Sequence, residues 1–369
     1  MGARYLFKFA PRTAFHFGLR GVGVEETATT CPADTLFSAL CLTLREWEGV
    51  QELEGWLARF PKDGQGGPPP LRLSSAFPYA GDVLFFPKPT VPANLPKATR
   101  QIRAKTLKKV EFVSKGILEA WLAQRDLNSE LADDQLLHGG QVWVTRQELA
   151  GLSLSVVGKG NGRMWEVQTL PRVTIDRMTS RSAVYQAGVV RFAEGAGLYT
   201  LVEFLDGDTV AAAAERDRLK TLFQVLGDGG LGGERSSGYG QFTLQGPQPL
   251  EGLAGGDGPL FLTLSPYHPT RQEVAGGVLD EGASYALLTR RGWVGSPEGP
   301  NLRRRMVRLL AEGSVLQHAK EGAGPSYGDL ADVTPHDAQG QPALGHPVWR
   351  YGIAFPVPAA QPVTQEEGA

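Results

Sequence analysis

The segment from residue 227 to residue 240 constrains the fold more than any other part of the sequence, because seven of its fourteen residues are glycine. Glycine lacks a Cβ atom, so such a loop can bring several backbone N–H groups close to one phosphate and can adopt positive φ angles at little cost. One arginine, two serines and one aromatic side chain lie among these glycines: Arg235, Ser236, Ser237 and Tyr239. We therefore interpret the loop as a site for an anionic ligand; the alternative interpretation is a solvated turn.

The flanking segments restrict the kind of site that this loop can form. Residues 211–226 carry apolar side chains at helical spacing, and residues 241–245 alternate polar and apolar side chains before Gly246-Pro247. These patterns predict a helix, then the glycine loop, then a strand. A dinucleotide-binding fold needs the opposite order, with the strand first. A P-loop needs a lysine directly after its last glycine, and no lysine follows Gly233. Neither nucleotide motif therefore fits.

The composition limits the possible partners and cofactors. The net charge of the 369 residues is −2, so nucleic-acid binding must depend on local basic patches. Residues 88–115 contain eight Lys and Arg residues and one acid, and residues 290–308 contain six arginines; each cluster is a candidate patch or a solvated surface. The two cysteines, Cys31 and Cys41, form no zinc or disulfide pattern, and His268, His336 and His346 are not spaced as metal ligands. We therefore predict no metal and no cofactor.

No apolar run approaches the roughly 20 residues of a membrane span, and no signal peptide is evident, so a cytoplasmic protein is expected. Strand-like and helical patterns alternate along the first 250 residues in the order βαβ, insertion, βαβ. This order predicts an α+β fold with two ferredoxin-like (RRM-like) βαββαβ units, the first with a long insertion and the second degenerate. The expected boundaries are residues 1–250 for the first unit, with an insertion at about 88–195, then 257–358 for the second and 359–369 for a disordered tail. A basic helix is expected within the second unit at residues 302–310.

A second candidate anion site lies near the N-terminus. Residues 32–47 predict an amphipathic helix that Thr30 or Asp34 would cap, and Thr35 and Ser38 would add polar groups on its first turns. The preceding strand and this helix are joined by a second loop rich in glycine, residues 16–23.

These motifs, in this order, resemble those of the RAMP superfamily (repeat-associated mysterious proteins) of CRISPR systems. More closely, the chain resembles the family of the fourth subunit of type III-A Csm effector complexes. The resemblance rests on six segments spread over nearly the whole chain: residues 15–18, 34–40, 175–177, 264–267, 312–315 and 346–352.

The resemblance implies a non-catalytic subunit of an antiviral ribonucleoprotein. Such a subunit would bind the repeat-derived 5′ handle of the CRISPR RNA (crRNA) and would bridge the large polymerase/cyclase-like subunit to the backbone RAMP filament. Phosphate contacts and stacked bases suit this task. Residues 172–191 would form a thumb-like hairpin that contacts RNA. The expected RNA-binding residues are His16, Gly18, Arg20, Thr35, Ser38, Arg172, Arg177, Arg181, Tyr185, Gly229, Gly230, Gly232, Gly233, Arg235, Ser236, Ser237 and Tyr239.

Enzymatic alternatives rest on two residues. Other RAMP proteins cleave CRISPR repeats, and His16 beside a glycine loop is a candidate general base. The sequence offers no evident acid or base to act with His16, so an RNA-contacting or partly buried histidine is the preferred interpretation. Asp34 raises the same question, because backbone subunits of such complexes cut RNA with an aspartate; a helix cap explains Asp34 more simply. No catalytic residue is therefore predicted.

Overall fold

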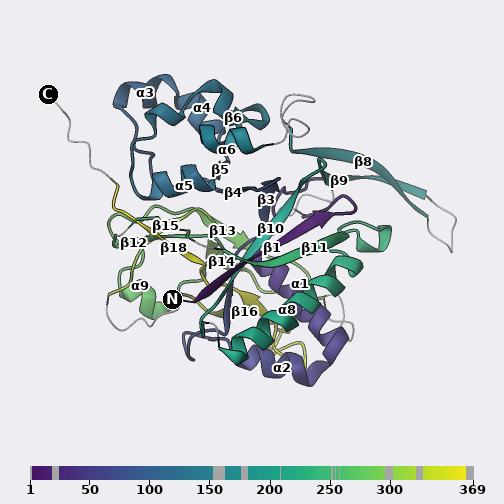
Figure 1. The fold of residues 1–369 in the computed structure, drawn as a ribbon. Coiled ribbons are helices and arrows are strands. Elements are labelled where there is room, and N and C mark those ends of the chain that lie inside the picture. The colour runs from purple at the N-terminus through teal and green to yellow at the C-terminus, as the bar shows by residue number, and fades with distance from the viewer. Residues whose placement is uncertain are drawn as a thin grey trace.

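The computed structural model describes most of the chain (Figure 1). The described residues are 2–18, 25–152, 163–175, 182–207, 209–250, 252–253, 255–256, 258–295, 302–320 and 327–362. Within these ranges, no helix is both long and apolar enough to cross a membrane.

A mixed sheet of nine strands forms the centre of the molecule, in the order β11-β1-β10-β3-β4-β5-β7-β6 with β2 paired to β10. The strands are β1 (Ala3–Pro11), β2 (Leu71–Leu73), β3 (Phe77–Ala80), β4 (Val83–Pro87), β5 (Phe112–Ser114), β6 (Leu136–Leu137), β7 (Val142–Trp143), β10 (Ala196–Phe204) and β11 (Phe242–Pro249). All pairs are antiparallel except β5 with β7. The four strands β11-β1-β10-β3 have the order and direction that a βαββαβ chain produces.

Three helices lie together on one face of β1, β10 and β11: α1 (Ala33–Glu48), α2 (Val50–Ala58) and α8 (Val210–Gly229) (Figure 1). The apolar stripe predicted for residues 211–226 is the buried face of α8. Phe223 of this stripe packs against Phe7 and Phe9 of β1, with ring centroids 5.2 and 5.1 Å apart. The helices predicted at 32–47 and 211–226 are thus confirmed, because burial of an amphipathic face fixes each helix on the sheet.

The chain between β4 and β10 forms a separate lobe and a ribbon. The lobe contains α3 (Lys97–Ile102), α4 (Ala104–Lys109), α5 (Lys115–Leu122), α6 (Arg146–Gly151) and the 3-10 turns η1 (Asn128–Glu130), η2 (Asp133–Gln135) and η3 (His138–Gly140). The ribbon pairs β8 (Trp165–Ile175) with β9 (Ser182–Phe192) and projects away from the body (Figure 1). The ribbon occupies the place of the predicted thumb-like hairpin.

In the residues that the structure describes, the C-terminal part consists of short strands and one short helix. They are β12 (Leu260–Thr263), α9 (Arg271–Ala275), β13 (Leu287–Arg290), β14 (Val307–Leu310), β15 (Val315–Gln317), β16 (Leu330–Asp332), β17 (Trp349–Tyr351) and β18 (Pro356–Ala359). A three-stranded sheet has the order β15-β12-β18, and β13–β14 and β16–β17 are hairpins. The helix predicted at 302–310 is wrong. Arg and Leu favour helices, but Val307 to Leu310 pair with β13, and the burial of Leu309 and Leu310 overrides that preference.

One hydrophobic core runs through both halves of the chain. Phe37 of α1 packs against Tyr351 of β17, with ring centroids 5.0 Å apart. The hydroxyl of Tyr351 accepts a hydrogen bond from the N–H of Leu73 in β2 (2.8 Å). These contacts hold the C-terminal part against α1, which places residues from both halves at one site.

Candidate nucleic-acid interface

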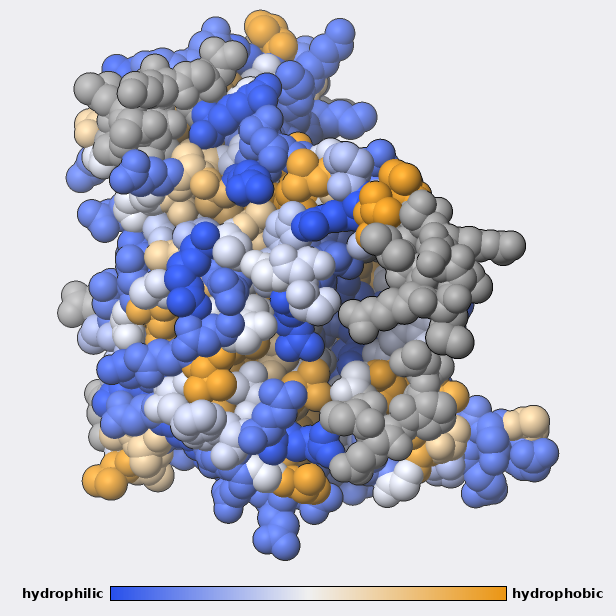
Figure 2. All heavy atoms as spheres, turned by 90° about the vertical axis from the view of Figure 1, so that its right-hand side faces the viewer, coloured by the Kyte–Doolittle hydropathy of each residue, from blue (hydrophilic) through white to orange (hydrophobic). Residues whose placement is uncertain are grey.

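Three segments that are far apart in the sequence meet at one pocket of about 240 Å³, here called the loop pocket. They are residues 16–18, the first turns of α1 and the glycine loop. The predicted residues that line the pocket are His16, Gly18, Thr35, Ser38, Gly230, Gly232, Gly233 and Arg235. The face of the molecule from which the ribbon projects is mainly hydrophilic, with hydrophobic residues in small separate patches (Figure 2).

The glycine loop has a defined shape, anchored to the segment that follows β1. The N–H of Gly233 donates to the carbonyl of His16 (2.8 Å), and the N–H of Gly240 donates to the carbonyl of Ala14 (2.8 Å). Leu231, which is fully buried, donates its N–H to the carbonyl of Gly240 (2.9 Å). Gly232 has a φ of 101°, and a Cβ atom there would lie 2.4 Å from the carbonyl oxygen of His16. The loop is therefore a structured element and not a loosely held turn.

The polar groups on the outer part of this loop face solvent. Arg235, Ser236 and Ser237 are exposed and form the 3-10 turn η4 (Arg235–Ser237). Among the described residues, the N–H groups of Gly232, Glu234, Arg235 and Ser236 have no hydrogen-bond partner, whereas those of Gly230 and Gly233 are occupied. The amides available for an anion are thus those of Gly232 and of the start of η4.

His16 is buried, with an exposed fraction of 5%. Its Nδ1 lies 2.6 Å from the carbonyl oxygen of Gly188 in β9; since a carbonyl only accepts, Nδ1 carries the proton in this contact. A Cβ atom on Gly233 would lie 2.6 Å from Cδ2 of the imidazole, so the ring fits closely against the glycine loop. His16 thus joins the ribbon to the loop and also lines the loop pocket.

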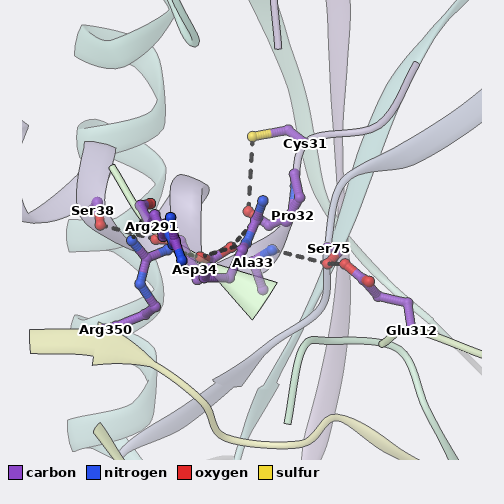
Figure 3. Close-up of polar contacts among 10 residues, drawn as sticks. Cys31, Pro32, Ala33, Asp34, Ser38, Ser75, Arg291, Glu312 and Arg350 are labelled. Carbon is purple, nitrogen blue, oxygen red and sulfur yellow. Dashed lines mark hydrogen bonds and ion pairs between the residues drawn. The ribbon is translucent and has the colours of Figure 1, made fainter. Parts of the chain in front are cut away.

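The start of α1 is held by residues other than those predicted. The N-cap position is Pro32, whose own side chain forms no capping hydrogen bond. The N–H of Ala33 donates to Ser75 Oγ (2.8 Å), and Ser75 in turn donates to Glu312 Oε1 (2.6 Å; Figure 3). Burial raises the pKa of Glu312. The prediction that Thr30 or Asp34 caps α1 is therefore wrong.

Asp34 instead forms a buried ion-pair cluster (Figure 3). Its fully buried carboxylate accepts from Arg290 Nε (3.0 Å) and Nη2 (2.6 Å), and also from Arg350 Nη1. Burial alone would raise the pKa of Asp34, but the two guanidinium groups lower it below its ordinary value. Asp34 thus fixes β13 and β17 against α1 and places Arg290 at the wall of the loop pocket.

Two predicted ribbon residues contact the glycine loop. Arg172 and Tyr185 face each other across the ribbon. The guanidinium of Arg172 lies 4.8 Å from the ring centroid of Tyr239, and the hydroxyl of Tyr185 donates weakly to Glu234 Oε2 (3.4 Å). The structure therefore brings these two residues together with the loop.

Other predicted residues lie apart from the pocket or cannot be placed. Gly229 is the last residue of α8, and Ser236, Ser237 and Tyr239 do not line the pocket. Arg20, Arg177 and Arg181 fall outside the described residues.

Sequence reasoning missed the grouping of Arg290, Arg350, Ser75 and Glu312 around the start of α1. Arg290 appeared only as part of a basic cluster, and Arg350 and Glu312 only within motifs of the family resemblance. In the part of the chain that the structure describes, no three His, Cys, Asp or Glu side chains are grouped as metal ligands.

Comparisons with known proteins find similarity to Csm4 proteins along most of the chain. Residues 256–359 match the family model of the CRISPR Csm4 C-terminal domain. A Mycobacterium tuberculosis (strain CDC 1551 / Oshkosh) protein named CRISPR system Cms protein Csm4 is 29% identical over 94% of this chain and 96% of its own length. The protein of the same name from Thermococcus onnurineus (strain NA1) is 26% identical over 88% of this chain and 90% of its own length.

Two solved structures share the fold. A chain in the crystal structure of the Csm3-Csm4 subcomplex of the type III-A CRISPR-Cas interference complex gives a TM-score of 0.63 at 16% identity, covering 96% of this chain and 99% of that chain. A chain in the crystal structure of the Csm1-Csm4 cassette in complex with cA4 gives a TM-score of 0.53 at 20% identity, covering 98% of this chain and 100% of that chain. The family model and the curated relatives confirm the resemblance that the sequence motifs predicted, and the two solved structures show the same fold.

Proposed function

Since this chain is a homologue of the Csm4 proteins of type III CRISPR systems, we propose that it is a non-catalytic subunit that binds the 5′ handle of the crRNA. The observation that carries the proposal is the loop pocket, where the three segments that the resemblance predicts to bind the handle meet. A phosphate in this pocket would meet the guanidinium groups of Arg235 and Arg290, and the hydroxyl of Thr35 would orient it. Such contacts hold an RNA end in one position without reaction.

The ribbon would complete the RNA site. Arg172 and Tyr185 stand beside the glycine loop, and a base unstacked from its neighbours can stack on an aromatic ring or a guanidinium plane. Arg20, Arg177 and Arg181 remain proposed contacts.

We also propose the partners and the internal organisation of the chain. Related proteins have been solved in a Csm3-Csm4 subcomplex and in a Csm1-Csm4 cassette. By analogy, this chain would bridge a backbone RAMP subunit and a large polymerase/cyclase-like subunit within the cytoplasm. The four strands β11-β1-β10-β3 with α1 and α8 would form the first ferredoxin-like unit, and residues 257–358 a degenerate second one.

Arg235 provides the test of handle binding. Its side chain is exposed at the pocket and forms no ion pair among the described residues, so it can be removed without disturbing the core. Arg235→Ala is expected to weaken binding of a labelled repeat-derived RNA by about 1–3 kcal/mol, the range for hydrogen bonds to a charged group. Fluorescence anisotropy at fixed salt measures the change, and Arg146→Ala in the separate lobe is the control. An unchanged affinity would remove Arg235 from the site.

A repeat endoribonuclease with His16 as general base is the second candidate, because His16 lines the loop pocket. A general base needs a reachable proton and usually a second group to orient it or to protonate the leaving oxygen. The Nδ1 of His16 bonds a backbone carbonyl and no carboxylate. The RNA from the binding assay is expected to be recovered intact after long incubation; cleavage that His16→Ala abolishes would establish the enzyme instead.

A further inference from the structure

A second pocket, of about 450 Å³, lies on an adjacent face of α1 and is here called the far pocket. Its walls come from α1, α2, residues 346–349, and Val294, Gly295 and Arg304. Ser38 and Leu42 line both the far pocket and the loop pocket. These two residues are one helical turn apart, about 6 Å along α1. The two pockets are therefore neighbours across a single turn of one helix.

Arg304 lines the far pocket. Its Nε is inaccessible to solvent and has no hydrogen-bond partner, and its guanidinium forms no ion pair among the described residues. Burial, together with the nearby charge of Arg350, lowers the pKa of Arg304 to about 10. The carboxylate of Asp34 is already bonded to Arg290 and Arg350. A partly buried cation with an inaccessible, unpartnered donor is costly, and an anion bound beside it would reduce that cost.

The rest of the lining combines charge with apolar surface. Arg45 and Lys62 add two more cations, against the single carboxylate of Glu54. The Nζ of Lys62 lies 5.2 Å from the ring centroid of Trp349, so charge and an aromatic ring stand side by side. The volume falls in the range of roughly 300–1,000 Å³ that is typical of small-ligand sites. This combination suits a group with an anionic end and a flat apolar part.

We propose that the far pocket binds a second nucleotide of the RNA strand that occupies the loop pocket, with its phosphate against Arg304 and its base against the apolar wall. This inference rests on the proposed function, because it requires RNA in the loop pocket. The position favours RNA over an acidic side chain of a partner protein, since a strand leaving the loop pocket crosses one turn of α1 to reach Arg304.

Arg304→Met tests the proposal, because methionine keeps much of the apolar stem and removes the charge. The probe is a fluorescein-labelled, repeat-derived single-stranded RNA of about ten nucleotides, within the usual range of single-strand sites. With the full chain, Arg304→Met is expected to lower the affinity about tenfold and to reduce the slope of log K against log salt by about 1. The control, Arg305→Met, removes a neighbouring guanidinium that is half exposed and lies 4.0 Å from Asp332; it should bind within about twofold of the unmodified chain.

Three outcomes separate the two proposals. If Arg304→Met binds as the unmodified chain does while Arg235→Ala is weakened, the far pocket holds no RNA but the proposed function stands. If the unmodified chain does not bind the probe, the proposed function fails and this inference fails with it. If Arg304→Met keeps its RNA affinity but loses a partner subunit, the occupant is an acidic protein group and the inference is overturned.

A crosslinking experiment on the unmodified chain tests the same proposal without relying on the folding of a variant. The same RNA with 4-thiouridine at successive positions is irradiated, and crosslinked peptides are identified by mass spectrometry. The proposal predicts that one position crosslinks to the segment 346–349 and an adjacent position to residues of the loop pocket. Crosslinks confined to the loop pocket would contradict it.

Discussion

Asp34→Ala is expected to lower the free energy of unfolding by about 3–5 kcal/mol, the range for removing one partner of a buried ion pair. The carboxylate is fully buried, and the Arg350 side chain is 5% exposed, so the substitution leaves a buried guanidinium without its counter-ion. The other guanidinium, Arg290, would lose its anchor beside the loop pocket. Urea denaturation followed by tryptophan fluorescence measures the loss.

Asp228→Ala is the matched control, because Asp228 pairs with Arg12 on the surface, with side chains 77% and 42% exposed. Exposed pairs contribute at most about 1 kcal/mol. The pH dependence gives a second readout. The folded-state pKa of Asp34 lies below its unfolded value, so its stabilisation is full above the unfolded pKa, near 4, and is lost as the pH falls through the folded pKa. An equally small loss of unfolding free energy in Asp34→Ala and Asp228→Ala would show that Asp34 does not hold the two halves of the chain together.

Gly232→Ala is expected to lower RNA affinity at least tenfold and to destabilise the chain by about 1–3 kcal/mol, the cost of a residue held in a disfavoured backbone conformation. The φ of Gly232 is 101°, and an added Cβ would lie 2.4 Å from the His16 carbonyl oxygen and 3.2 Å from the ring of Phe17. The loop must therefore move away from the 16–18 segment, which opens the loop pocket. Anisotropy titration and urea denaturation measure the two effects.

Gly229→Ala tests whether any glycine of the segment would respond in the same way. Gly229 ends α8, and an added Cβ would meet nothing within 4 Å. Alanine there should leave stability within about 1 kcal/mol and RNA affinity unchanged. If Gly232→Ala binds RNA as well as Gly229→Ala does, the shape of the loop is not what the ligand recognises.

Much of the N-terminal fold could be predicted from the sequence, because its elements are long and strongly periodic. The amphipathic patterns at 32–47 and 211–226 became α1 and α8, and residues 242–245 of the predicted strand lie in β11. The C-terminal part was harder to predict. Its strands are three or four residues long. The arginine-rich stretch before Leu310 has a high helix propensity, but its last residues pair with β13 as a strand.

The candidate site was only partly predictable, for a similar reason. Glycine patterns and a helix start are local signals, and the structure brings the three predicted segments around one pocket. The partners of Asp34 lie 256 and 316 residues away in the sequence, at Arg290 and Arg350. A local rule for helix starts assigned Asp34 as a cap, whereas tertiary packing placed two guanidinium groups beside it. Arg304 was visible only as a member of a basic run, because its lack of an ion pair among the described residues depends on the fold.

The most direct test of RNA binding at the loop pocket is a structure of the full chain, in its reconstituted complex, with the repeat-derived RNA end bound. We predict a ribose-phosphate backbone in the pocket between Thr35 and Arg235, with a phosphate oxygen within hydrogen-bond distance of the Arg235 guanidinium or of an amide at the start of η4. Bound RNA that lies elsewhere, with residues 230–238 in contact only with solvent or protein, would contradict the account.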